Sequence, residues 1–263
     1  MTGVDDFERP VSGRRSREDE RALSDVIGFV LTFSVIVASV AIVSTFGMQA
    51  LEDIRGNEQE NNAQRAFQVM AENFKEIERG RAPRRSSELK LNEGSLTVVN
   101  DSAFQVGVGG TGFNRTIYPQ RIQYEHDNTF IGYENGATLR GNIQSGGSAM
   151  QYRPELVCTD NRAIVSFIEL ETSFDRSLSG GTLRVTGDLQ RSELIYPEKR
   201  TGKPNATSGD QVNVTVDSTF ARGWRNYLED RDNWERANSR KWSCTDVDQV
   251  YIRKTVIRVT FVR

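Results

Sequence analysis

Six residues, Gly107-Val108-Gly109-Gly110-Thr111-Gly112, have the G-x-G-x-x-G spacing of a dinucleotide-binding loop. This spacing holds a pyrophosphate only where a helix begins directly after the glycines and presents its free N–H groups to the phosphates. Here residues 113–119 have the composition of a strand or loop, and Pro119 would break a helix. We therefore interpret the motif as a glycine-rich loop between two strands, and we predict no cofactor.

Residues that could act as acids, bases or nucleophiles are few. The only histidine, His126, is followed by an Asp-Asn pair typical of a turn, so we expect a solvated turn residue and not a catalytic base or a metal ligand. Catalysis by a cysteine would need a free thiolate beside that one histidine. Glu169 and Glu171 have the spacing of one exposed strand face, which explains them without chemistry. The sequence predicts no enzymatic activity, no catalytic residue and no metal site.

An uncharged run extends from Val26 to Met48, a stretch of 23 residues. As a helix rising about 1.5 Å per residue it would be about 34 Å long, enough to cross a hydrocarbon core of about 30 Å. An ordinary secretory signal fits less well, because its apolar region is shorter and its cleavage site needs a small residue where Met48 stands. The run predicts a transmembrane helix that the mature protein keeps.

Charges on either side of the run predict its orientation. Basic residues precede the run, and the first charged residues after it are acidic. Positive charge favours the cytoplasmic side of a membrane. These charges are Arg14, Arg15, Arg17 and Arg21 before the run, then Glu52 and Asp53 after it. We expect a single-pass membrane protein with a cytoplasmic N-terminus and with everything after about residue 50 outside the cell.

The segment Arg21-Ala22-Leu23-Ser24-Asp25-Val26-Ile27-Gly28, followed at once by the apolar run, resembles the start of an archaeal type IV pilin or pilin-like protein. The resemblance covers about residues 18–48. It implies that a prepilin peptidase cuts between Ala22 and Leu23 and leaves the helix on the mature protein. Two positions depart from pilin patterns: Asp25 stands where many archaeal pilins carry Pro, and Ile27 stands where bacterial pilins place an acidic residue.

The same residues also fit a signal-anchored surface protein that is neither cleaved nor polymerised. Two small-x-x-x-small pairs within the span, Ser34 with Ala38 and Ala41 with Thr45, would let neighbouring helices approach closely. Such pairs are common in single spans, so both interpretations stay open.

The two cysteines, Cys158 and Cys244, lie on the predicted outer side, where thiols can remain oxidised. A disulfide between them would close a loop of about 86 residues and, in the chain-entropy model, would stabilise the fold by about 4 to 5 kcal/mol. We expect this disulfide. The alternatives are two independent buried thiols, or metal ligands, which would need more Cys or His than the chain offers.

Four Asn-x-Ser/Thr sequons begin at Asn100, Asn114, Asn205 and Asn213. On the cell exterior they could accept N-linked glycans that shield the protein from proteases. Asn114 and Asn205, which we place in loops, are the strongest candidates.

Charge and composition restrict the partners. The chain has 34 Lys and Arg against 36 Asp and Glu, and 37% of its residues are hydrophobic. This balance, without a basic stripe interleaved with aromatics outside the leader, argues against a nucleic-acid partner. The length left after the span, about 180 residues in the globular part, suits one domain.

From Asn57 to Arg79 the apolar residues recur at spacings of three and four, and Gly80 follows as a left-handed cap. This predicts an amphipathic stem helix that continues the membrane helix outward, with a weakness at Gly56. Its stripe would cover the following domain or pack on neighbouring stems. The stripe consists of Ala63, Ala66, Phe67, Met70, Phe74 and Ile77.

Beyond the basic connector at residues 79–85 the apolar period changes to two, which indicates strands. Leu89 and Leu91, a turn at residues 92–94, and then Leu96 and Val98 predict a hairpin. Further strands are expected at residues 121–125, 129–134, 137–140, 163–171, 182–185, 193–196, 212–216 and 250–261.

One late helix is predicted from Ser218 to about Arg231, with Ser218 as its cap. The expected fold class is therefore α+β, a long transmembrane and stem helix followed by a β-rich head built as an antiparallel sheet or sandwich. The predicted parts are a cytoplasmic leader (1–22), a transmembrane helix (23–50), an amphipathic stem (51–80) and an extracellular head (81–263). This layout is also similar to that of large pilin-like surface proteins of haloarchaea.

These features predict a pilin-like cell-surface protein, a minor subunit of a type IV pilus-like filament. Its expected partners are membrane lipid, a prepilin peptidase and other pilin subunits bound through the N-terminal helix. The alternative is an uncleaved single-pass module whose head binds a glycan or an envelope partner through exposed aromatics near Trp224, Trp234 and Trp242. A tryptophan-rich core beside the disulfide would bury those side chains instead.

Overall fold

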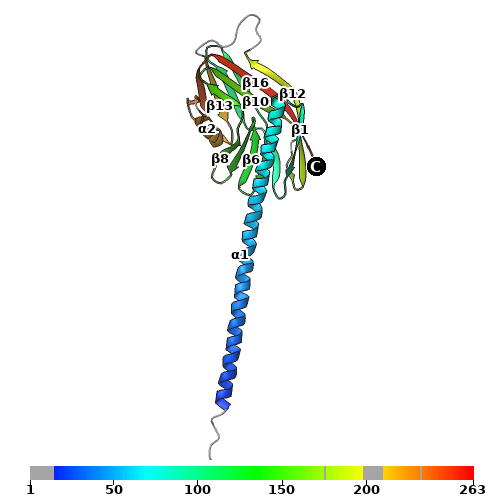
Figure 1. Ribbon diagram of the computed structural model, residues 1–263, viewed down its shortest axis with the longest axis vertical. Coiled ribbons are helices and arrows are strands. Elements are labelled where there is room, and N and C mark those ends of the chain that lie inside the picture. The colour runs from blue at the N-terminus through cyan, green and yellow to red at the C-terminus, as the bar shows by residue number, and fades with distance from the viewer. Residues whose placement is uncertain (1–14, 175, 198–209, 232) are drawn as a thin grey trace, which may run out of the picture. The chain divides into compact units, whose positions relative to one another are not determined.

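The computed structural model describes residues 15–174, 176–197, 210–231 and 233–263. The chain forms two compact units, residues 1–57 and residues 58–263. We call the second of these the head unit. The fold is α+β, as predicted: a long apolar N-terminal helix precedes a β-rich domain of largely antiparallel sheets, and one late helix follows among the described residues (Figure 1).

Helix α1 runs from Arg15 to Glu78 and belongs in part to each unit. It is continuous at Gly56, where a weakness was predicted, because one glycine costs a helix interior only about 1 kcal/mol. Gly80, which has φ +71°, caps the end of the helix as predicted. The N–H of Gly80 donates to the carbonyl of Ile77, and the N–H of Arg81 donates to that of Glu76, both at 3.0 Å. This pair of bonds is a Schellman cap.

Sixteen described strands form three sheets in the head unit. Sheet A has the order β1 (Arg84–Lys90), β12 (Thr182–Tyr196), β16 (Gln249–Val262), β10 (Arg162–Glu171) and β9 (Leu156–Thr159). Sheet B has the order β11 (Leu178–Ser179), β2 (Ser95–Val99), β5 (Arg121–His126), β6 (Thr129–Glu134), β7 (Ala137–Asn142) and β8 (Ser148–Tyr152). Sheet C has the order β14 (Glu235–Arg236), β15 (Lys241–Val247), β13 (Asp210–Asp217), β3 (Ala103–Val108) and β4 (Phe113–Ile117).

Sheet A carries buried residues on both of its faces. Its strands β10 and β16 pair in parallel, with Arg162 opposite Gln249, whereas the other strand pairs are antiparallel. Along β10, Phe167 packs into one hydrophobic cluster and the next residue, Ile168, packs into another. Successive side chains of a strand point to opposite faces, so the two clusters lie on opposite faces of this sheet.

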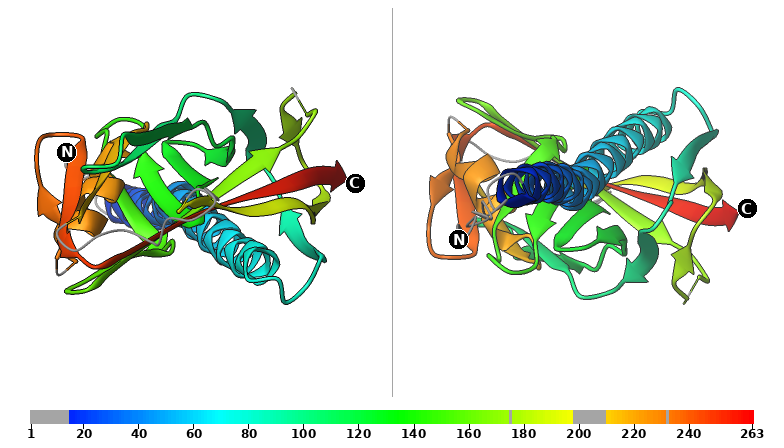
Figure 2. Two further views of the ribbon diagram at one scale, coloured as in Figure 1. Left: turned by 90° about the horizontal axis from the view of Figure 1, so that it is seen from above. Right: turned by 90° about the horizontal axis from the view of Figure 1, so that it is seen from below.

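The last turns of α1 supply one of these clusters. Phe67, Met70, Phe74 and Ile77 are buried there among side chains from sheets A and B. Figure 2 shows the last turns of α1 beside the strands of the head unit. The predicted amphipathic stripe therefore covers the head unit itself, one of the two outcomes that its pattern allowed. The periodic spacing places these side chains on one side of the helix, which explains why they can be buried together.

The second cluster contains helix α2 (Ala221–Glu229), which packs beside β8 and β13 (Figure 1). The predicted apolar side of this helix is buried, including Trp224 and Leu228. Its predicted cap is wrong: the N-cap position is Phe220, and the hydroxyl of Ser218 accepts a bond from the N–H of Phe220 and donates to Glu134. Glu134 lies in a distant strand, so sequence spacing could not indicate this competing partner.

One predicted hairpin forms and another does not. Asn135 and Gly136 both have positive φ and join β6 to β7, as their dipeptide predicted. The hairpin expected around residues 92–94 is wrong, because β1 pairs with β12 in sheet A whereas β2 pairs with β5 in sheet B. The turn itself exists, with the N–H of Gly94 donating to the carbonyl of Leu91, but it passes the chain from one sheet to another.

Candidate membrane-anchoring helix and head surface

The apolar segment of α1, residues 26–48, is helical throughout and every side chain in it is exposed. Phe29 is 71% exposed, and Leu31 on the opposite side of the helix is 61% exposed. Among the described residues one helix is long and apolar enough to span a membrane, the part of α1 from Val26 to Glu78. Its most apolar window has a mean hydropathy of 2.7 and no buried residue.

Apolar side chains surround this segment on all sides. A surface helix of a globular protein instead has one apolar stripe and one polar face. Leaving so much hydrocarbon in water is unfavourable by about 25 cal/mol for each Å² of apolar surface. The segment therefore needs an apolar medium, which lipid or a set of similar helices would provide.

Three of the five hydroxyl groups in the segment are already paired within the helix. Thr32 donates to the carbonyl of Gly28 at 2.8 Å, and Thr45 donates to that of Ala41 at 2.9 Å. Ser39 does the same with Ile36 at 2.8 Å. Because these hydroxyls bond to the helix's own backbone, lipid would not leave them unpaired.

The predicted processing residues Arg21, Ala22 and Leu23 lie within helix α1, ahead of the apolar segment. Cleavage between Ala22 and Leu23 stays a prediction. The leader arginine at position 14 lies outside the described residues.

The predicted disulfide between Cys158 and Cys244 is confirmed, with the two Cα atoms 5.9 Å apart. It joins β9 of sheet A to β15 of sheet C, two sheets that the hydrophobic cluster around α2 also connects. A covalent link between residues 86 positions apart restricts the unfolded chain strongly. The disulfide thus stabilises the contact between sheets A and C within the head unit.

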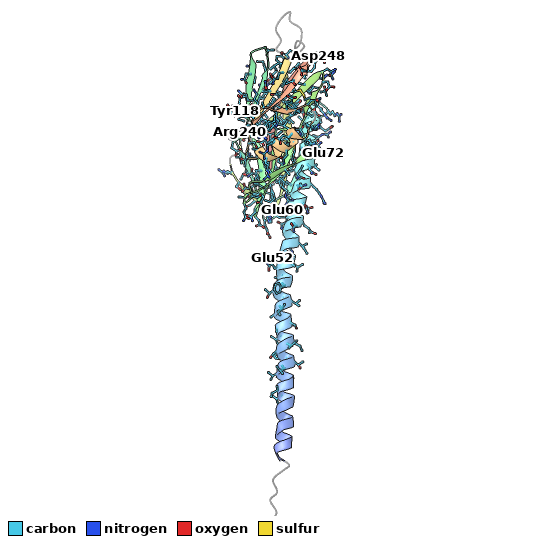
Figure 3. The ribbon with its side chains drawn as sticks, turned by 90° about the vertical axis from the view of Figure 1, so that its left-hand side faces the viewer. Glu52, Glu60, Glu72, Tyr118, Arg240 and Asp248 are labelled. Carbon is cyan, nitrogen blue, oxygen red and sulfur yellow. A yellow bond between two sulfur atoms is a disulfide. The ribbon has the colours of Figure 1, made fainter. Side chains whose placement is uncertain are left out.

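The tryptophans near this disulfide do not form a surface patch. Trp224, Trp234 and Trp242 are all buried, with Trp242 only 1% exposed. Among the described aromatic residues of the head unit, Tyr118 alone is exposed, at 67%. Figure 3 shows Tyr118 and Arg240 on the opposite side of the head unit from Glu72 of α1. The three tryptophans therefore do not form the exposed aromatic site that the alternative function needed.

The sequons occupy different environments. Asn100 follows β2 and is exposed, and Asn114 is exposed on β4, an edge strand and not the loop we expected. Asn213 is half-buried within β13, where its side-chain oxygen accepts a bond of 2.8 Å from Ser243. Asn205 lies outside the described residues. Glycosylation at these positions stays a prediction, and exposure favours the first two over Asn213.

The residues first considered for chemistry are held apart. The glycine-rich loop connects β3 to β4 as predicted, with positive φ at Gly110 and Gly112 and no helix after it. The expectation of a solvated His126 is wrong: its side chain is 7% exposed, because it ends β5, which has β2 and β6 on its two sides. Glu169 lies on β10 and forms an ion pair with Lys254 of the adjacent β16. No group of three or more possible metal ligands occurs among the described residues.

A buried ionic cluster, which the sequence did not reveal, joins sheet B to α2. Arg121 of β5 is 2% exposed and its Nη1 lies 2.8 Å from Oδ1 of Asp101 and 4.0 Å from Oε1 of Glu134. Glu134 also accepts bonds from Trp224 Nε1 at 3.0 Å and from Ser218 Oγ at 2.7 Å. These residues lie far apart in the chain, and no spacing rule connects them.

Burial and bonding oppose each other in this cluster. Burial raises the pKa of the Glu134 carboxyl, although its hydrogen bonds and the charge of Arg121 act against the rise. Burial also acts to raise the pKa of Asp101, but the bond and charge of Arg121 hold that pKa below its usual value. Removing one member would leave an unpaired charge inside the protein, which is strongly destabilising. We assign the cluster a structural role.

A second ionic group fastens the end of α1 to the head unit. Lys75 Nζ lies 3.3 Å from Glu155 Oε1, and Arg79 donates to the same carboxylate oxygen. Glu155 precedes β9, so the group joins the helix end to sheet A. Burial acts to raise the pKa of Glu155, but the hydrogen bond from Arg79 and the charge of Lys75 hold that pKa below its usual value.

Comparison with protein families gives one match. A family model described as "Family of unknown function (DUF7289)" matches residues 21–262. Among curated proteins and among solved structures nothing matches the chain. The matched region begins at Arg21, ahead of the apolar segment, and continues through β16.

Proposed function

From the premise that the chain belongs to the family of unknown function DUF7289, we propose that it is a pilin-like membrane-anchored surface protein. In this proposal a prepilin peptidase removes residues 1–22, and the helix that begins at Leu23 anchors the protein in the membrane with the head unit outside the cell. The helix then packs against other pilin subunits in a type IV pilus-like filament, as a minor component. The protein acts as a binding and structural element and not as an enzyme.

One observation carries the proposal. The segment Arg21-Ala22-Leu23-Ser24-Asp25-Val26-Ile27-Gly28 lies at the start of the apolar part of α1, whose apolar side chains are exposed all round. A helix of this kind can be stable in lipid or among similar helices, because both remove its apolar side chains from water. That property is what a subunit needs if it waits in a membrane and is later extracted into a filament.

A face of small residues supports helix packing in particular. Ser34, Ala38, Ala41 and Thr45 follow one another at spacings of four, three and four in α1, so they share one side of the helix. Small side chains let two helix backbones approach closely. The hydroxyl of Thr45 is already bonded within its own helix, which leaves this face without an unpaired donor at that position.

The N-terminal mass of the membrane-extracted protein tests the processing step. Cells with the peptidase should yield a chain that begins at Leu23, and cells without it should yield one that begins at Met1. Replacing Arg21 with Gln should slow cleavage, whereas the matched change Arg17→Gln should not. A chain that begins at Met1 in cells that contain the peptidase would contradict the proposal.

Cysteine cross-linking tests assembly. Both native cysteines are in the disulfide, so an introduced cysteine is the only free thiol. Ser34→Cys should give linked dimers in isolated filaments, whereas Ile36→Cys, which points to the other side of the helix, should give few. Equal cross-linking at both positions, or labelling of the whole cell surface and not of filaments by an antibody to the head unit, would favour the uncleaved surface module instead.

A further inference from the structure

An open cleft of about 370 Å³ lies on the head unit, lined by residues of β6, β7 and β8, of the turn between β7 and β8, and by the second residue of α2. We call it the β8 cleft. Its polar lining includes Thr129, Arg140, Asn142, Ser145, Gln151 and Arg222. The remaining lining residues are small, and none of the lining residues is acidic or aromatic.

The charge of the cleft is positive and partly unpaired. Arg140 binds the carboxylate of Glu60, but Arg222 is exposed and has no ion pair or side-chain hydrogen bond among the described residues. Arg222 also lies in the first turn of α2, which contains no acidic residue. An anion in the cleft would therefore meet a free guanidinium, whereas the N–H of Gly223 at the helix end already donates to Ser148.

The unpaired hydroxyl of Thr129 independently indicates a ligand. Thr129 is only 8% exposed and lines the cleft, yet its hydroxyl has no hydrogen-bond partner among the described residues. A ligand oxygen or hydroxyl in the cleft would provide one.

The walls of the cleft are held in place before any ligand binds. Ser148 Oγ accepts a bond of 2.8 Å from the N–H of Gly223 and donates to the carbonyl of Phe220, which fixes the start of α2 on β8. In the turn between β7 and β8, Asn142 Oδ1 accepts a bond of 2.9 Å from the N–H of Ser145. Binding would therefore require little ordering of the protein.

We propose that the β8 cleft binds a carboxylate-bearing sugar of an acidic polysaccharide. Arg222 can hold a carboxylate through two parallel hydrogen bonds. Thr129, Ser145 and the amide of Gln151 provide the donors and acceptors that sugar hydroxyls need. The volume suits a ligand of one or two sugar units, since small-molecule sites measure roughly 300 to 1,000 Å³. A peptide would bring apolar side chains for which this lining offers no contact.

The test uses the full chain in detergent, so that it does not depend on processing or assembly. Isothermal titration at low salt compares trigalacturonate with neutral maltotriose, with inorganic sulfate and with a triglutamate peptide. We expect trigalacturonate to bind and maltotriose not to bind. Binding of sulfate or triglutamate as tight as that of trigalacturonate would overturn the proposal, because it would indicate a general anion site.

Two substitutions in α2 form the matched pair. Arg222→Gln should weaken trigalacturonate binding by about tenfold or more, as loss of a charge-assisted bond does. Arg225→Gln removes the same charge from the same helix but outside the cleft lining, so it should change the affinity by less than about twofold. Thr129→Val, nearly the same size, should weaken binding by a few fold. Equal losses for Arg222→Gln and Arg225→Gln, with both variants folded by their melting temperatures, would overturn the proposal.

Discussion

Two stretches of helix α1 differ in where their apolar residues lie. Between residues 26 and 48 every side chain is exposed, and apolar residues occupy all sides of the helix. Between Ala63 and Ile77 the apolar residues occupy one stripe and are buried, while Val69 on the other side is 50% exposed. The backbone is the same α-helix in both stretches. The distribution of apolar residues around the helix, and not their presence, decides whether a stretch needs lipid or a protein surface.

The comparison also shows how differently the two stretches are held. The buried stretch has specific partners: the ring of Phe74 meets that of Tyr133 edge-on at 5.1 Å, and Thr138 Oγ1 donates to the carbonyl of Phe67. In the apolar stretch the side-chain hydrogen bonds of the described residues run to the helix's own carbonyls. Substitutions in the exposed stretch (residues 26–48) should therefore be tolerated while they stay apolar. Substitutions in the buried stretch (residues 63–77) should be tolerated only while they keep the size and shape of the side chain.

Charges in the apolar stretch should have the largest effect. Val37→Asp together with Ala41→Asp should oppose membrane insertion by about 5 to 7 kcal/mol, since one aspartate at the centre of a span opposes it by about 2.5 to 3.5 kcal/mol. The protein should move from the pellet to the supernatant in alkaline carbonate extraction. Val69→Asp, on the exposed side of the buried stretch, is the control and should stay in the pellet. A double variant that stays with the membrane would show that residues 26–48 do not hold the protein in lipid.

Phe74→Ala should have the next largest effect. Phe74 is 1% exposed, and truncating a buried phenylalanine typically lowers the free energy of unfolding by about 3 to 5 kcal/mol. Denaturant unfolding followed by tryptophan fluorescence measures the loss, because all three tryptophans lie in the head unit. Val69→Ala is the matched control and should change the stability by less than about 0.5 kcal/mol. Membrane extraction should be unchanged in both variants.

Gly187→Ala examines how closely the helix approaches sheet A. A Cβ atom at Gly187 would lie 2.6 Å from Cε1 of Phe74 and 3.1 Å from Cγ2 of Ile257. Overpacking of this kind should lower the free energy of unfolding by about 1 to 3 kcal/mol. In a Phe74→Leu background the same change should be less destabilising, because the smaller side chain leaves room. Additive losses in the double variant would show that the two residues do not meet.

Acid should loosen the end of α1 by a smaller amount. The pKa of Glu155 is lowered in the folded state, so its contribution is present above the unfolded pKa of about 4.5 and is lost as the pH falls through the lower folded value. Arg79→Gln should reduce this loss of stability by less than about 1 kcal/mol, since the pair is partly exposed. Unfolding measured from pH 6 down to pH 3 provides the test.

Arg65→Gln is the control for the acid experiment, because Arg65 is exposed and has no ion pair among the described residues. Burial raises the pKa of Glu134, and that contribution changes with pH in the opposite direction. Subtracting the pH profile of stability of each variant from that of the native chain cancels the contribution of Glu134, which is the same in both. Identical profiles for Arg79→Gln and the native chain would contradict the assignment of Glu155.

Local patterns were sufficient for several parts of the molecule. The spacing from Ala63 to Ile77 predicted the buried stripe, Gly80 predicted the helix cap, and Asn135-Gly136 predicted the turn between β6 and β7. Each depends on residues within a few positions of one another. The disulfide is a different case, because only two cysteines were present to choose from.

The sequence by itself determined the α+β class, the long apolar helix and the positions of most strands, because these follow from periodicity and from residues that accept special backbone angles. Only the tertiary structure decided that β1 and β2 enter different sheets, that His126 is buried, and that Arg121 meets Glu134. The β8 cleft belongs to the same group, since it brings Thr129 and Arg222 together from distant parts of the chain. The physical reason is that strand pairing and burial depend on which distant residues fill the remaining space, and a local pattern carries no information about them.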